Sequence, residues 1–157
     1  MKPLRVLSLF DGISCGRIAF EKAEIPIEVY YASEIDKYAI AVTQKNYPDT
    51  IQVGDIRELD GTEFEGKIDI LIGGSPCQNF SSLGDRKGLS GEKSSLFYEY
   101  VRILEEVKPK YFLLENNANM PKKAKEIISE MLGVEPIRIN SKKFVQQNRD
   151  RYYWTKR

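Results

Sequence analysis

A length of 157 residues, of which 41% are hydrophobic, predicts one packed domain and argues against a disordered chain. No apolar run approaches the roughly 20 residues of a membrane span, and Asp11 interrupts the apolar stretch that a signal peptide would need. Two cysteines make no disulfide framework. We therefore expect a cytoplasmic protein with free thiols. The net charge is +1. The sequence has no histidine, the commonest metal ligand and general base, so we expect no metal site. Acid–base chemistry must therefore use carboxylates, thiols, amines or water.

Apolar runs and helical periodicity alternate along the chain. The first expected elements are a strand at 4–10, a turn at 11–16 with Ser14 as candidate N-cap, a helix with Cys15, Ile18, Ala19 and Ala23 on its apolar face, a strand at 27–32, a helix at 38–46 and a short strand at 50–53. A strand at 68–72, a polar stretch at 78–93, a helix at 94–107, a strand at 111–114, a helix at 122–131 and strands at 136–140 and 151–155 follow. This alternation predicts an α/β fold with a mostly parallel sheet, helices on both faces and a single domain over 1–157.

The charge is distributed unevenly along the chain. Residues 137–157 carry seven lysines and arginines against Asp150 alone, a net charge of +6 that leaves −5 for the remainder. A basic end on an acidic body indicates an edge that faces a polyanion, and a solvated basic tail is the alternative interpretation.

Residues suited to a nucleoside follow the first three strands. Gly12 and Gly16 come after the first strand, Glu34 after the second and Asp55 after the third, and ligands of open parallel sheets bind at these strand ends. A carboxylate there can accept hydrogen bonds from ribose hydroxyls. The Lys-Ser/Thr pair of a P-loop does not follow these glycines, which excludes a P-loop. A strict G-x-G-x-x-G is also absent, which disfavours a dinucleotide ligand. Glycines that serve only helix–strand packing are the alternative.

A thiol and a carboxyl group follow the next two strands. Cys77 lies at a strand end beside Pro76, and Glu115 ends the neighbouring strand, which would bring the two side chains together as nucleophile and proton donor. The alternatives are a buried structural cysteine and a carboxylate that leaves the sheet into solvent.

Four runs in this order, Ser8–Gly16, Gly73–Gln78 (GGSPCQ), Leu114–Asn116 (LEN) and Gln147–Arg151 (QNRDR), resemble the motifs of the cytosine-5 DNA methyltransferases. The resemblance spans nearly the whole chain and implies a Rossmann-like fold, S-adenosylmethionine as methyl donor with S-adenosylhomocysteine as product, double-stranded DNA with a flipped cytosine as substrate, and a role in DNA methylation or restriction–modification.

The family's donor-binding roles transfer to matching positions. Phe10 would pack against the adenine, Glu34 would bind the ribose with Ile35 on the base, and Asp55 would accept a hydrogen bond from the adenine amino group next to Ile56. The resemblance also places Gly12, Ile13, Ser14, Gly16, Pro76 and Leu96 at the donor.

The same resemblance assigns the catalytic roles. Cys77 would be the nucleophile, and Glu115 the acid on ring nitrogen 3 of cytosine, with burial favouring its protonated form. Arg149 and Arg151 would hold the target base, Arg151 nearest the carbonyl at carbon 2. The stretch 78–93 would be a lid over the flipped base with Arg86 and Lys87 at the phosphates, or an ordinary surface loop.

Family members continue beyond the QNRDR strand into a target-recognition region and a helix that closes the donor pocket. We therefore expect the chain to need a second chain or a missing segment for activity. An RNA cytosine-5 methyltransferase and a catalytically incomplete donor-binding subunit are the alternative functions.

Overall fold

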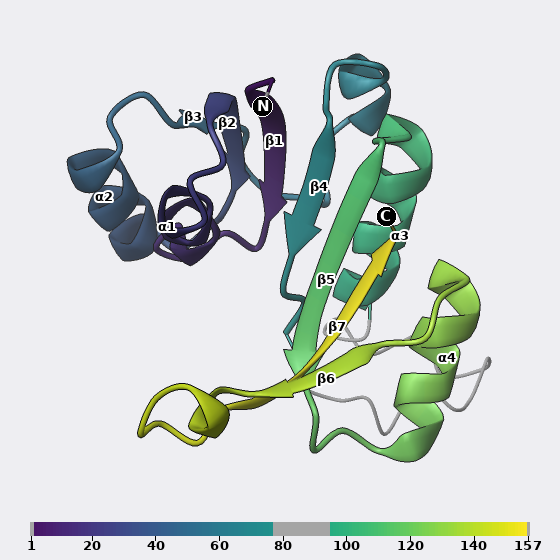
Figure 1. Cartoon of the computed structure of the whole chain (residues 1–157). Helices are drawn as coiled ribbons and strands as arrows, with labels where there is room; N and C mark the ends of the chain where they lie inside the picture. The colour runs from purple at the N-terminus through teal and green to yellow at the C-terminus, as the bar shows by residue number, and fades with distance from the viewer. Residues whose placement is uncertain (1, 77–94, 157) are drawn as a thin grey trace.

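A computed structural model describes residues 2–76 and 95–156, and these residues form a seven-stranded sheet in the order β3-β2-β1-β4-β5-β7-β6. The strands are β1 (Leu4–Leu9), β2 (Ile27–Ser33), β3 (Ile51–Gln52), β4 (Ile70–Gly73), β5 (Tyr111–Asn117), β6 (Ile137–Asn140) and β7 (Asp150–Lys156). The first five run parallel, whereas β7 pairs antiparallel with both β5 and β6 (Figure 1). The predicted mostly parallel sheet is confirmed.

Helices cover both faces of the sheet, as predicted. They are α1 (Cys15–Lys22), α2 (Lys37–Asn46), α3 (Ser95–Val107) and α4 (Lys122–Leu132), with short 3-10 helices η1 (Gly61–Phe64) and η3 (Ser141–Lys143). Helices α1 and α2 lie on the side of the sheet opposite to α3 and α4 (Figure 1). None of the helices in the described part of the chain is long and apolar enough to cross a membrane.

The main hydrophobic core lies between the sheet and helices α3 and α4. Leu7 and Leu9 of β1 and Leu71 of β4 are fully buried there. Trp154 of β7 is also fully buried, and its indole N–H donates to Ser129 Oγ of α4 over 3.0 Å. Because side chains alternate along a strand, Val6 of β1 points to the other face, into a smaller cluster.

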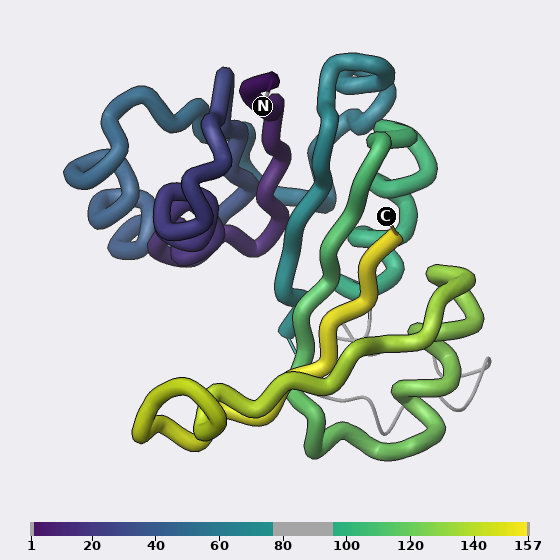
Figure 2. Tube along the Cα trace, in the orientation of Figure 1, coloured from purple at the N-terminus to yellow at the C-terminus, as the bar shows by residue number. Residues whose placement is uncertain are grey.

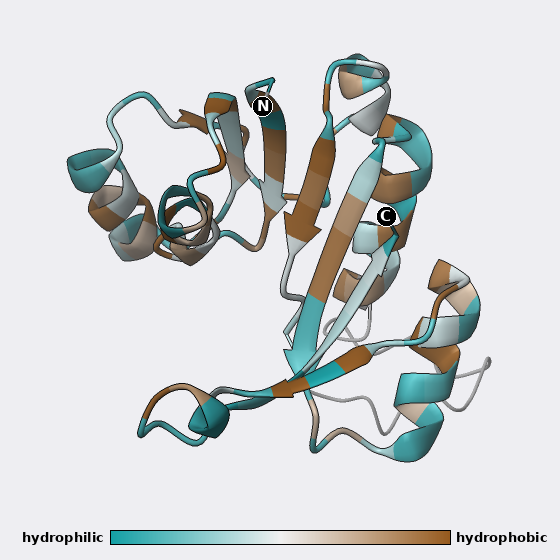
Figure 3. Cartoon of the chain, viewed as in Figure 1, coloured by the Kyte–Doolittle hydropathy of each residue, from teal (hydrophilic) through white to brown (hydrophobic). Residues whose placement is uncertain are grey.

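The order of the strands fixes where a ligand binds. The chain runs outward from β1 through β2 to β3, and it then returns to β4 on the other side of β1. The crevice at the carboxyl ends of β1 and β4 is therefore the topological switch point, where ligands of such sheets bind. The central strands are hydrophobic along most of their length, and β5 becomes hydrophilic at its carboxyl end (Figure 3).

Two local predictions differ from the structure. The apolar face predicted for α1 is not buried: no residue of that helix is fully buried, Cys15 is exposed and Ile18 is 37% exposed. The strand predicted to end at Leu114 continues to Asn117, because its last three residues pair with Arg151–Tyr153 of β7. Glu115 therefore lies within the sheet and does not terminate the strand.

The end of the β6–β7 hairpin, which carries η3, extends away from the rest of the molecule (Figure 2). Its exposed surface includes the apolar side chains of Ile137, Ile139 and Phe144, so the strand predicted at 136–140 exists but is not a core strand. Arg138 forms an ion pair with Asp150 across the hairpin at 2.7 Å, which partly neutralises this basic segment.

Candidate functional site

The turn that follows β1 has an unusual backbone conformation. Phe10, Gly12 and Ser14 have φ angles of 55°, 60° and 62°, in the left-handed region. For Phe10 and Ser14 this conformation costs about 1–2 kcal/mol each, so surrounding contacts must hold the turn in place. Such strain in a loop at a switch point is typical of a ligand-binding site.

Asp11 supplies several of these contacts. Its carboxylate accepts hydrogen bonds from Tyr30 Oη of β2 at 2.7 Å and from Ser14 Oγ. Ser14 Oγ also lies 3.0 Å from Thr43 Oγ1 of α2. Burial, followed by the charge of Asp11, raises the pKa of Tyr30, so the phenol stays neutral and donates. Ser14 does precede α1, but its side chain makes no cap hydrogen bond because it is engaged by Asp11 and Thr43.

Glu34, at the end of β2, is bound by three backbone N–H groups. Gly12 N donates to Glu34 Oε2 at 2.7 Å, and Ile35 N and Asp36 N donate to Oε1 at 2.8 and 2.9 Å. The carboxylate therefore joins the turn after β1 to the segment after β2. Two carboxylate oxygens offer about four acceptor positions, so Glu34 retains acceptor capacity for a ligand hydroxyl.

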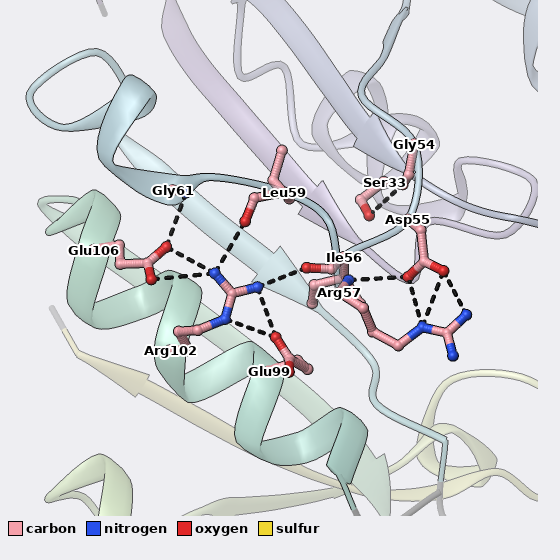
Figure 4. Close-up of polar contacts among 10 residues, drawn as sticks. All are labelled: Ser33, Gly54, Asp55, Ile56, Arg57, Leu59, Gly61, Glu99, Arg102 and Glu106. Atoms are coloured by element: carbon pink, nitrogen blue, oxygen red, sulfur yellow. Dashed lines mark hydrogen bonds and ion pairs between the residues drawn. The ribbon is translucent and has the colours of Figure 1, made fainter. Parts of the chain in front are cut away.

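Asp55 is held in a comparable way beyond β3. Arg57 N donates to Asp55 Oδ1 at 2.9 Å, and the Arg57 guanidinium donates through Nε and Nη2, the latter at 2.5 Å from Oδ2 (Figure 4). The hydrogen bond from the Arg57 side chain is the largest influence that lowers the pKa of Asp55. Asp55 is thus an ionised acceptor at neutral pH, suited to an amino or hydroxyl donor.

These side chains surround a cavity of about 480 Å³ at the switch point. That volume lies in the range of small-molecule sites, and the walls combine apolar side chains with two carboxylates. Seven residues predicted to bind the donor line it: Phe10, Glu34, Ile35, Asp55, Ile56, Pro76 and Leu96.

Sequence analysis missed three residues that also line the cavity, Ser33, Arg57 and Gly74. The position of Arg57 next to the predicted Asp55-Ile56 pair was the available signal. Gly74 directly follows β4, and a Cβ there would lie 3.0 Å from Glu115 Oε2, so this glycine allows the carboxylate to approach the cavity.

Four other predicted donor residues, Gly12, Ile13, Ser14 and Gly16, are not among the lining residues. Gly12 and Ser14 shape the turn through the contacts described above. Ile13 is 48% exposed. A Cβ on Gly16 would lie 2.5 Å from Ile72 Cδ1, so Gly16 lets α1 approach the sheet, which favours the packing interpretation for this glycine.

The predicted catalytic carboxylate lies beside this cavity. Glu115 Oε1 is 2.6 Å from Arg151 Nε and 3.6 Å from Arg149 Nη2. The antiparallel register explains this, because Glu115 is opposite Tyr153 and its diagonal neighbour on the same face is Arg151. Glu115 Oε1 is buried, and its ion pairs with Arg151 and Arg149 hold the carboxylate at this position.

The segment before the predicted nucleophile is also fixed by β5. Asn116 Nδ2 lies 3.3 Å from both the carbonyl oxygen and Oγ of Ser75, two residues before Cys77. Cys77 itself and the predicted lid at 78–93, with Arg86 and Lys87, lie outside the described residues. The structure therefore places Glu115, Arg149 and Arg151 together, next to the point where the chain leads into Cys77.

A model of one protein family, the C-5 cytosine-specific DNA methylases, matches residues 4–155. The chain belongs to this family. Its members use S-adenosylmethionine to methylate cytosine in DNA, and the sheet described above is the Rossmann-like fold of such methyltransferases.

Individual relatives agree with this assignment. The chain is 37% identical to the orphan methyltransferase M.SPRI of Bacillus phage SPR over 98% of its own length and 37% of that protein. It is 40% identical to the type II methyltransferase M.NgoPII of Neisseria gonorrhoeae over 75% of its own length and 34% of that protein. The crystal structure of the S. pombe Dnmt2 methyltransferase superposes with a TM-score of 0.80 at 26% identity, covering 97% of this chain and 50% of that one. The chain thus spans only about a third of the length of these two curated relatives.

Proposed function

We propose that the chain binds S-adenosylmethionine in the cavity at the switch point and transfers its methyl group to carbon 5 of a cytosine flipped out of duplex DNA. The observation that carries this proposal is the convergence of a two-carboxylate, apolar-walled cavity with Glu115 and Arg151. Gly74 forms part of the cavity wall and is close enough to Glu115 that the donor and the base would meet there.

The cavity suits the two ends of an adenosyl group. Glu34 has acceptor capacity left for the ribose hydroxyls after binding its three backbone N–H groups. Asp55 is ionised and would accept a hydrogen bond from the adenine amino group, with Ile56 beside it. Phe10 and Ile35 would pack on the faces of the purine, since both line the same cavity.

The chemistry requires activation of carbon 5, which is a poor nucleophile in cytosine. Cys77 would add through its thiolate to carbon 6, and the electron pair of the 5,6 double bond would then make carbon 5 nucleophilic. S-adenosylmethionine supplies an electrophilic methyl group. After carbon 5 has gained the methyl group, loss of its proton and departure of the Cys77 thiolate restore the double bond.

Glu115 and Arg151 would hold the base during this sequence. A protonated Glu115 would donate to ring nitrogen 3, where charge develops as the thiolate adds. Arg151 would stabilise the carbonyl oxygen at carbon 2, and Arg149 would hold the surroundings of the base. The register of β5 and β7 supports this arrangement, because it brings Arg151 beside Glu115. Arg149 directly precedes β7 and lies 3.6 Å from the same carboxylate.

Target recognition requires contacts to base edges in the major groove. Relatives are much longer than the matched region, and we propose that a segment outside these 157 residues, on the same or a second polypeptide, supplies those contacts and closes the donor pocket. The basic residues of the β6–β7 hairpin would add phosphate attraction that is largely independent of sequence.

The test is transfer of a radiolabelled methyl group to duplex DNA, followed by mapping of the modified base. The assay compares the chain alone with the chain plus a candidate partner segment. A duplex whose target cytosines already carry 5-methyl groups is the control substrate. We expect 5-methylcytosine with the partner, and weak, non-specific DNA binding with little or no turnover for the chain alone.

Four outcomes would contradict parts of this proposal. Methylation of another atom or base would refute the assigned chemistry. Transfer to transfer RNA oligonucleotides in preference to duplex DNA would make the chain an RNA methyltransferase. Robust, sequence-specific methylation by the isolated chain would refute the requirement for a further segment, and donor binding without turnover under every condition would indicate a non-enzymatic subunit.

A further inference from the structure

The segment that displays Asp55 and Ile56 is held from the outside by α3. This segment, residues 55–61, leads from the end of β3 to the first residue of η1 and belongs to no strand. Arg102 of α3 donates from Nη2 to the Ile56 carbonyl oxygen at 2.7 Å and from Nη1 to the Leu59 carbonyl oxygen at 2.9 Å (Figure 4). One guanidinium group therefore binds the Leu59 carbonyl and the Ile56 carbonyl, the second of which also accepts from Leu59 N over 3.4 Å in a turn.

Two glutamates fix the orientation of Arg102. Glu99 Oε2 accepts from Arg102 Nε at 2.7 Å, and Glu106 Oε2 accepts from Nη1 at 2.9 Å. Glu106 Oε2 also accepts from Gly61 N at 2.9 Å, so the same network holds both ends of residues 56–61. The network is partly shielded from solvent, since the three side chains are 26–33% exposed.

Helix α3 and η1 approach too closely at Gly61 for a larger residue. A Cβ at Gly61 would lie 2.6 Å from Glu106 Oε2 and 2.8 Å from Glu106 Cβ. Leu96, near the start of the same helix, also lines the cavity. Arg102 thus joins two walls of the cavity, although it is not itself among the lining residues.

We propose that Arg102 is a positioning residue for donor recognition: it holds residues 55–61 so that Asp55 and Ile56 face the amino edge of the adenine. This inference rests on the proposed function, because it assumes that the cavity binds an adenosyl donor. Arg102 would act through the backbone of Ile56 and would not contact the donor.

Lysine cannot replace arginine in this role. A guanidinium group presents five N–H donors in a fixed plane, and Arg102 uses this fork on two carbonyl oxygens and two carboxylates at once. The ammonium group of a lysine is a single donor centre, so it would retain the charge and lose most of this geometry.

The test measures the affinity of the full chain for two probes by calorimetry. The probes are S-adenosylhomocysteine and S-inosylhomocysteine, in which an oxygen replaces the adenine amino group. We expect the wild type to prefer the adenine probe and Arg102→Met to bind it about tenfold more weakly, with the ratio of the two affinities falling toward one. Arg102→Lys should show an intermediate ratio.

Arg5→Met is the matched control. Arg5 binds Asp69 through Nε and Nη2 at 2.9 and 3.0 Å, and its side chain is 29% exposed against 33% for Arg102. The pair lies near the amino ends of β1 and β4, away from the cavity, so this variant should lose stability and keep the wild-type affinity ratio.

The results separate the two claims. If the wild type binds neither probe, the proposed function fails and this inference fails with it. If the wild type binds and Arg102→Met keeps both affinities, or loses both equally with an unchanged ratio, the positioning role is refuted and the donor site stands. Should Arg102→Met not fold, as seen by circular dichroism, the ratios of Arg102→Lys and Glu106→Gln decide the question by the same criterion.

Discussion

Glu34→Gln removes a carboxylate that joins the turn after β1 to the end of β2, while leaving the side-chain shape almost unchanged. In the wild type, one oxygen accepts from Gly12 N and the other from Ile35 N and Asp36 N. A glutamine side chain has one acceptor oxygen and one NH2 group. The NH2 group must then face at least one of these N–H groups, and two hydrogen-bond donors cannot bind each other. Either the glycine turn or the segment after β2 then loses its acceptor.

The expected loss has two separate parts. In the absence of S-adenosylhomocysteine, the loss of one hydrogen bond to a partly buried or exposed N–H group should lower the free energy of unfolding by about 0.5–1.5 kcal/mol. In addition, a ribose hydroxyl that loses a charged acceptor should cost about 1.5–3 kcal/mol of binding, a fall in affinity of about 10- to 150-fold. Glu34→Ala should reduce affinity at least as much, because no acceptor remains.

The assay pairs denaturant unfolding of the free chain with calorimetric titration of S-adenosylhomocysteine. Both measurements use temperatures at which the Glu34 variants are fully folded, so that partial unfolding is not mistaken for weak binding. Unchanged affinity in both Glu34 variants would refute the role of this carboxylate at the donor. A loss of stability alone would leave Glu34 as a structural tie between the two strand ends.

Three further predictions concern chemistry and stability. Cys77→Ala should abolish methyl transfer by the active assembly and leave S-adenosylhomocysteine affinity nearly intact, and retained turnover would exclude Cys77 as the nucleophile. Glu115→Gln should slow single-turnover methylation far more than it weakens DNA binding, whereas equal losses would indicate a structural role. The hydrogen bond from Arg5 lowers the pKa of Asp69 from 3.8 to about 2, so this pair stabilises the fold above about pH 4 and the contribution disappears as the pH falls toward 2. Denaturation at several pH values should therefore show a steeper acid loss for the wild type than for Asp69→Asn, and parallel curves would contradict the assignment.

Local patterns were sufficient to predict the strands in chain order and a mostly parallel sheet. The apolar run of β4 is continuous and that of β1 is interrupted only by Arg5 and Ser8, because both faces of these strands are covered. The polar residues directly after the strands mark the ligand edge. This is why Gly12, Glu34 and Asp55 could be placed at one ligand edge from the sequence pattern, whereas the role of Phe10 came from the resemblance to the family.

Features that depend on distant partners could not be predicted in this way. The extension of β5 to Asn117 depends on pairing with β7, and η1 depends on Glu106 and Arg102 of α3. Periodicity indicated an apolar face on α1, but it carries no information on whether another element covers that face. The hydrogen bond of Asp11 with Tyr30 likewise arises only when β2 lies beside β1.

The central claim is that the cavity at the switch point binds the methyl donor, and an NMR titration of the isotopically labelled chain with S-adenosylhomocysteine tests it most directly. We predict saturable shifts of the backbone amide signals of Gly12, Ile35 and Ile56, which surround the cavity or its carboxylates. The signals of the β6–β7 hairpin should remain unchanged. Absence of any shift at saturating ligand, or shifts confined to the hairpin, would contradict the account.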